Sequence, residues 1–279
     1  MKKFAQRHAV SASLLVIAAA VFAFTFVASP VFAQADGQRL DAPAAAPPAA
    51  SAPTAKAILA MAESDYYVLQ GQGVKAFQCD IQPNWAKLIT DPAKLKLVRP
   101  IEYTAVIDEQ GGVQVSPFRA DKAAIDPSLD QIVGGVQQLI SGFFQTWNPL
   151  VFSGVFSPAQ DGGLGFSSQA DGYHFTQATG GTNVDMTLTK DALVTEMKVT
   201  TADSVIVMMP TYVPTNGGLM LLTGLNNDIN NGTQKVDLQI AYQPAEGFQL
   251  PSTVSYQVTL PTQVVDIEMS LSDYQVVKR

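Results

Sequence analysis

The sequence contains a single cysteine, Cys79, and this scarcity limits how the chain can be stabilised. No intrachain disulfide can form. Because Cys79 lies within the apolar run VKAFQCDI, we expect it to be a small buried core residue, with an intermolecular bridge as the alternative. A chain of 279 residues can bury a full core without disulfides.

Basic residues are also scarce, and two long stretches have none. No lysine or arginine occurs between Lys122 and Lys190, or between Lys198 and Lys235. The first 33 residues carry three of the 17 basic residues and none of the 24 acidic ones, so the remainder has a net charge of −10. This charge disfavours nucleic acid and anionic membrane surfaces as partners. The gaps leave no cationic cradle for phosphates.

Groups that could support catalysis are few. Beyond residue 33 the only histidine is His174. A Ser-His-Asp site needs one histidine, but no G-x-S-x-G elbow is present, since the run at 165–169 lacks its closing glycine. A zinc site would need several histidines or cysteines at suitable spacing. We therefore predict that the protein is not an enzyme and needs no cofactor or metal.

Two weaker chemical alternatives remain in the sequence. The run NNDINNGT at 226–233 places amide and carboxylate groups at alternate positions, as a calcium loop does. However, Asn231 stands where the loop needs glycine and no glutamate closes it, so we predict a turn. Paired carboxylates are the second alternative, but the sequence gives no distance between them. The candidates near predicted strand ends are Glu102, Asp108, Asp171, Asp185 and Asp203.

The N-terminal 54 residues are typical of an exported protein. Three basic residues precede an apolar stretch at about 9–27, and Val31-Phe32-Ala33 fits a small-x-small cleavage site. We predict a signal peptide at 1–33 and a periplasmic or secreted protein, with an uncleaved N-terminal anchor as the alternative. Residues 34–54 are rich in alanine and proline, which predicts a disordered linker. The remainder, 55–279, is predicted to be a single domain.

Two segments have helical periodicity. The first is 55–70, which ends at Gly71 and Gly73. The second is 126–147, where Asp126 can cap the helix and Pro127 occupies its first turn. Its apolar residues follow the i, i+3, i+4, i+7 pattern without a gap, so this stripe must lie against another apolar surface, and a sheet is the expected partner. The stripe consists of Leu129, Ile132, Val133, Val136, Leu139, Ile140, Phe143, Phe144 and Trp147.

The rest of the chain predicts strands. A strand at 74–81 and a hairpin at 101–118 come first, and a series of short strands follows residue 163. We expect neighbours in sequence to pair in antiparallel fashion. The last strand changes phase, and a bulge near Ser272-Asp273 would reconcile its two halves. The predicted later strands are 164–168, 172–177, 183–188, 192–200, 203–209, 235–243, 252–260 and 263–277.

Residues 203–225 form an unusual apolar segment. It is rich in methionine and interrupted by two prolines and a Gly-Gly pair, and it is too broken to span a membrane. Such a segment fits either an irregular core or an adaptable surface for hydrophobic ligands.

Three short motifs give a resemblance to a known family. They are IEYTAVIDEQGGV at 101–113, TLTKDALVTEMKV at 187–199 and EGFQLPSTVSY at 246–256. In this order, after a signal peptide and a helix, the motifs resemble the periplasmic lipoprotein-carrier superfamily of open β-barrels. The resemblance implies a strongly curved antiparallel sheet with helices over its concave side and acyl chains between them. The family's basic position for cargo release has no match here, and the central helix is longer.

We therefore predict an α+β fold: a strongly curved antiparallel sheet, open or half-barrel, covered on its concave side by helices. The predicted function is binding or carrying a lipid or lipoprotein acyl chain in the cell envelope, with a transient envelope partner. The alternative is a non-catalytic structural or interaction domain with a sealed core. The predicted ligand-binding residues are Val136, Ile140, Phe143, Phe144, Trp147, Met208, Met209, Leu221, Phe248 and Tyr256.

Overall fold

The computed structural model describes residues 53–154 and 164–279. The predicted signal peptide and almost all of the predicted linker lie outside the described residues. Within the described part no helix is both long and apolar enough to cross a membrane.

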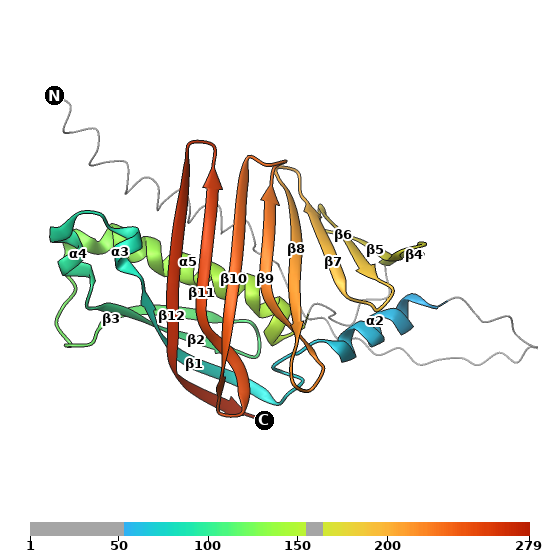
Figure 1. Ribbon diagram of the computed structural model, residues 1–279, viewed down its shortest axis with the longest axis horizontal. Coiled ribbons are helices and arrows are strands. Elements are labelled where there is room, and N and C mark those ends of the chain that lie inside the picture. Colours follow the sequence, from blue (N-terminus) through green and yellow to red (C-terminus); the bar gives the residue numbers. More distant parts are fainter. Residues whose placement is uncertain (1–52, 155–163) are drawn as a thin grey trace, which may run out of the picture.

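The fold is built on one antiparallel sheet of twelve strands (Figure 1). Strands β12 to β4 follow each other in reverse order of sequence, and β1 inserts between β12 and β2. The sheet is open, with β3 and β4 as its edges. The strands are β1 (Val74–Pro83), β2 (Ile101–Asp108), β3 (Val113–Arg119), β4 (Leu164–Ser168), β5 (Gly172–Thr179), β6 (Thr182–Thr189), β7 (Val194–Thr200), β8 (Val205–Pro214), β9 (Met220–Ile229), β10 (Gln234–Ala245), β11 (Phe248–Leu260) and β12 (Gln263–Lys278).

The predicted antiparallel sheet and its sequential pairing are confirmed for β4 to β12. The predicted hairpin of β2 and β3 is also present, and β7 pairs with β8 in antiparallel fashion. Between β10 and β11 the tight turn has both central residues, Glu246 and Gly247, at positive φ, which matches the right-handed twist of the flanking strands. The strand at 220–229 was not predicted, and β8 extends five residues beyond its predicted end at 209.

The predicted bulge in the last strand is confirmed. Gln78 pairs with Gln275 and Asp80 pairs with Ser272, so β12 carries one extra residue at this point. Asp273 adopts a left-handed backbone conformation with φ 53°. Up to Leu271 the odd-numbered residues of β12 face the core. After the extra residue the even-numbered residues, beginning with Tyr274, do so, which explains the change of pattern in the sequence.

In the described part of the chain, four α-helices accompany the sheet. Helix α2 (Ala55–Asp65) begins at Thr54, whose hydroxyl accepts from the Ala57 amide. It ends earlier than predicted because Tyr66 is extended and bridges to Met220 of β9. Two short helices, α3 (Trp85–Leu88) and α4 (Pro92–Val98), connect β1 to β2 and were not predicted.

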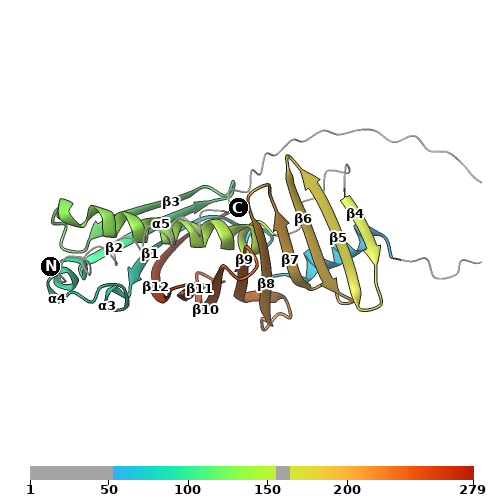
Figure 2. The same cartoon turned by 90° about the horizontal axis from the view of Figure 1, so that it is seen from above.

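The predicted long helix is α5 (Asp130–Trp147), preceded by a 3-10 turn, η1 (Pro127–Leu129). The Asp126 carboxylate accepts from the Ser128 amide at 2.8 Å, as expected of a cap. Helix α5 continues directly into a π-helical turn, η2 (Asn148–Phe152). Figures 1 and 2 show α5 running alongside β1–β3 and across β9–β12.

Buried apolar side chains form two clusters. The larger unites α5 and η2 with β1, β2 and β8–β12. The smaller joins α2 to β5–β7 through residues such as Ile58, Ala62 and Phe175. Tyr66 lies in the smaller cluster and its hydroxyl accepts from the Val194 amide at 2.7 Å. Helix α2 is therefore packed on β5–β7, whereas α5 belongs to the other half of the sheet.

Cys79 is fully buried in β1, and its burial predicts an unreactive thiol. Burial raises the pKa of Cys79 from its ordinary 9.0 to about 12, although a hydrogen bond with Tyr274 acts in the opposite direction. Near pH 8 this leaves about a thousandth of the usual thiolate. We expect a thiol reagent such as DTNB to label the folded protein at least ~1,000-fold more slowly than the urea-unfolded protein. Labelling of the native protein at a comparable rate would contradict this burial.

Candidate functional site

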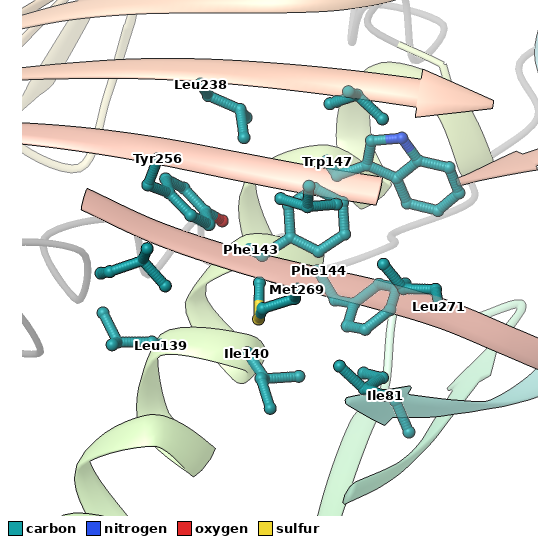
Figure 3. Packing of buried hydrophobic residues seen from close by; sticks show 14 of the residues in the cluster. Ile81, Leu139, Ile140, Phe143, Phe144, Trp147, Leu238, Tyr256, Met269 and Leu271 are labelled. Atoms are coloured by element: carbon teal, nitrogen blue, oxygen red, sulfur yellow. The ribbon is translucent and has the colours of Figure 1, made fainter. Parts of the chain in front are cut away.

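The apolar stripe of α5 is fully packed against the sheet. Eight large apolar side chains of the helix are buried: Ile132, Val133, Val136, Leu139, Ile140, Phe143, Phe144 and Trp147. The ring centroid of Phe143 lies 6.3 Å from that of Tyr256 in β11, edge to face, and Trp147 lies 6.0 Å from Phe77 in β1. Figure 3 shows the rings of Phe143, Trp147 and Tyr256 between α5 and the strands. The helix therefore fills the space that a ligand would occupy.

Most of the predicted ligand-binding residues are brought together here. The larger cluster contains Val136, Ile140, Phe143, Phe144, Trp147, Met208, Leu221 and Tyr256. Phe248 is partly buried against the cluster, and Lys278 Nζ lies 5.3 Å from its ring centroid. Met209 is separated from the others: it is 43% exposed, because adjacent residues of a strand face opposite sides and Met208 faces inward.

Hydrogen bonds hold α5 mainly to one side of the sheet. Tyr103 of β2 donates its hydroxyl to the Val133 carbonyl at 2.9 Å, and Gln137 Nε2 donates to the Val115 carbonyl of β3 at 2.7 Å. Toward β8–β12, the described residues supply one side-chain hydrogen bond to the helix, from Trp147 Nε1 to the Tyr242 hydroxyl at 3.1 Å. The rest of that contact is apolar. Helix α5 is thus held to β2 and β3 by two hydrogen bonds, whereas its contact with β9–β12 is apolar apart from the bond to Tyr242.

Several buried side-chain polar atoms of the described part lack a hydrogen-bond partner, and two of them, on β9 and β11, are considered for the contact with α5. The Tyr256 hydroxyl and the Asn227 side-chain oxygen have no hydrogen-bond partner among the described residues, and each residue is 7% exposed. Burial raises the pKa of Tyr256 well above its usual value. Leaving such a group unsatisfied costs about 1–3 kcal/mol. Sequence reasoning chose Tyr256 for its apolar ring and missed Asn227, which it placed in a turn.

Two hollows of the described part lie on the other face of the sheet. The larger, of about 400 Å³, surrounds Gly224, and a smaller one of about 210 Å³ adjoins it beside Lys87. Both are lined largely by polar side chains, including Thr211, Asp237, Gln239 and Ser255. Neither hollow lies between α5 and the strands. A ligand bound between α5 and the strands would therefore require the helix to move.

The catalytic alternatives find little geometric support. His174 Nε2 lies 3.9 Å from an Asp185 oxygen, and both side chains are about one-third exposed on β5 and β6. Among the described residues no three histidine, cysteine or acidic side chains could hold a metal ion together. The predicted turn is confirmed only for 230–233, where Asn230 and Asn231 have positive φ and Asp228 accepts from the Gly232 amide; residues 226–229 belong to β9 instead.

No protein-family model and no curated protein matches the chain. The class of the protein is defined by its fold alone. This fold is an open, twelve-stranded antiparallel sheet with a long helix whose apolar stripe packs on it.

Proposed function

We propose that this protein binds and carries a hydrophobic ligand, such as a lipid or a lipoprotein acyl chain, in the cell envelope. In this proposal the sheet acts as a curved half-barrel, α5 covers its concave side, and the ligand inserts between α5 and β9–β12. The observation that carries the proposal is the asymmetric attachment of the helix. Hydrogen bonds from Tyr103 and Gln137 tie it to β2 and β3, whereas its contact with β9–β12 is almost wholly apolar. The envelope location rests on the signal-like sequence at 1–33.

The free energies of burial limit how far α5 can move away from the sheet. Exposing all eight buried side chains of α5 would cost about 12–24 kcal/mol, at about 1.5–3 kcal/mol each. Burying an acyl chain of about 16 carbons contributes roughly 13 kcal/mol, at about 0.8 kcal/mol per methylene. A single chain therefore offsets full exposure of the helix only at the lowest end of this range. It can replace the contacts toward β9–β12 while those toward β1–β3 remain.

The sheet has a seam at which its two parts could separate. Pairing between β1 and β12 is irregular at two places, between Val74 and Ala76 and between Gln78 and Asp80. Bulges bend strands and disrupt the ladder locally. We propose that β1–β3 and α5 move together away from β9–β12 at this seam to admit the ligand. The π-helical turn η2, which follows α5, is of a kind often found at functional sites.

Native mass spectrometry of protein purified from its own host tests the proposal. We expect an adduct of lipid mass that organic extraction removes, and saturable binding of a fluorescent apolar probe by the extracted protein. The control variant is Val264→Ala, which changes a residue of β12 that is 57% exposed. This variant should bind the probe like the wild type. Absence of both the adduct and probe binding would refute the proposal.

A sealed structural or interaction domain is the second candidate. The direct contact between Phe143 and Tyr256 favours it, as does the position of the two hollows on the opposite face. In that case the extracted protein should unfold cooperatively, and its unfolding midpoint should be unaffected by lipid or probe. A midpoint that rises with ligand concentration would exclude this candidate, because only binding to the native state stabilises it.

A further inference from the structure

We propose that the ligand is an uncharged long-chain ester, whose carbonyl oxygen accepts a hydrogen bond from the Tyr256 hydroxyl. The inference rests on the proposed function, because it places the ester in the space between α5 and β9–β12. It specifies the chemical class of the ligand, whereas apolar contacts alone would accept any hydrophobic molecule.

Three other tyrosines in or against the larger cluster have hydrogen-bonded hydroxyls, whereas the Tyr256 hydroxyl has no partner among the described residues. Tyr103 donates to the Val133 carbonyl at 2.9 Å, and Tyr274 donates to the Pro251 carbonyl at 2.6 Å. Tyr242 accepts from Trp147. A phenylalanine at 256 would fill almost the same space without burying an unsatisfied hydroxyl. Without a ligand, the buried hydroxyl therefore lowers the stability of the protein. A ligand that accepts a hydrogen bond from it would remove this cost.

Among the described residues, no side chain accepts a hydrogen bond from Tyr256. Across the ladder it pairs with Leu238 on β10 and Ile267 on β12, and its ring contacts Phe143 of α5. All three are buried and apolar. In Figure 3 the hydroxyl of Tyr256 points toward the side chains of α5 rather than back into the sheet. A ligand entering between α5 and β11 would thus meet this donor directly.

Asn227 provides a second polar group on the same inner face. It lies on β9, pairs with Val236 of β10 and Met208 of β8, and alternates with the buried residues Leu225 and Ile229. Two strand spacings and two residues separate it from Tyr256 on the ladder, which amounts to about 12 Å. An amide at this distance could contact a second oxygen or hydroxyl of the same ligand, as in a molecule with more than one ester group.

The absence of buried charge favours an uncharged ligand. In the described part the buried polar residues are Asn148 and Asn227, and no lysine, arginine or acidic side chain is among them. A carboxylate or phosphate placed beside Tyr256 would lose its hydration without gaining a cation, which is far more costly than burying an ester. Free fatty-acid anions and phospholipid head groups are therefore expected to be excluded from this depth.

Ligand competition against a bound apolar probe tests the inference with defined compounds. Methyl hexadecanoate, heptadecane and hexadecanoate are compared on the wild type, Tyr256→Phe and the matched control Tyr274→Phe, which also loses one hydroxyl. We expect the wild type to prefer the ester. Tyr256→Phe should lose about 3- to 10-fold in ester affinity, the value of one hydrogen bond, with alkane affinity unchanged. Tyr274→Phe should keep the ester preference. Unfolding midpoints should show Tyr256→Phe at least as stable as the wild type.

The outcomes separate this inference from the proposed function. If the wild type binds ester and alkane but Tyr256→Phe leaves their ratio unchanged, the role of Tyr256 is refuted and the carrier proposal stands. Hexadecanoate binding as tightly as the ester at pH 8 would refute the exclusion of charge. If the wild type binds none of the three compounds, the proposed function itself fails.

Discussion

Replacement of Phe143 by alanine is expected to lower the free energy of unfolding by about 3–5 kcal/mol, the cost of emptying a well-packed aromatic site. Phe143 is 1% exposed at the centre of the contact between α5 and the sheet. Its ring centroid lies within 6.3 Å of those of Phe144, Trp147 and Tyr256. Alanine would remove contacts with both the helix and β11, and surrounding rings could fill the space only in part. Urea denaturation followed by circular dichroism measures the change.

Met209→Ala is the matched control for this loss. Met209 is also a large apolar residue predicted from sequence to bind the ligand, but it is 43% exposed on the opposite face of β8. Its replacement should change stability by less than about 0.5 kcal/mol. If Phe143→Ala also cost less than about 1 kcal/mol, α5 would not be packed on the sheet in solution, and an open state would have to be the main one.

The sequence predicted the elements with the strongest periodicity and missed those in which the pattern is broken. Helix α5 has an unbroken apolar stripe, and the structure buries it from Ile132 to Trp147. Strand β9 was missed because Gly224 and the polar run Asn226-Asn227-Asp228 hide its alternation. A register shift between Thr211 and Tyr212 also changes the phase of its partner β8. Single-sequence patterns carry no signal for such irregular pairs.

The pairing of β1 with β12 could not be read from the chain. These strands are separated by about 180 residues, and sequential pairing is only a default. Yet this pairing joins the two parts of the sheet that contact α5. The helix stripe therefore predicted that a partner surface exists, whereas the identity of that surface depends on contacts between distant residues.

The candidate site was predicted only in part, because which residues face it also depends on contacts between distant residues. Aromatic and methionine side chains were chosen by type, and most of them meet in one cluster. Met208 and Met209 could not be told apart, because a strand's inward face is set by its neighbours and not by composition. Asn227 could have been found once β9 was known, since it shares parity with Leu225 and Ile229.

Gly172→Ala is expected to lower the free energy of unfolding by about 2–3 kcal/mol, as overpacking against rigid backbone does. Gly172 begins β5 and pairs with Thr189 of β6. A Cβ atom built on it would lie 1.9 Å from the Leu188 carbonyl oxygen, so the backbone of β6 would have to move. Because Leu188 belongs to the cluster under α2, the displacement should loosen that helix as well. Thermal unfolding and proteolysis near α2 measure the two effects.

Gly134→Ala is the matched glycine control, with the opposite expected sign. Gly134 lies inside α5, and a Cβ atom there would meet nothing within 4 Å. Alanine in a helix interior is more favourable than glycine by about 1 kcal/mol, so this variant should be more stable than the wild type. Opposite shifts of the two variants would show that close strand approach, rather than glycine's flexibility, requires Gly172. Equal shifts would contradict the contact between β5 and β6.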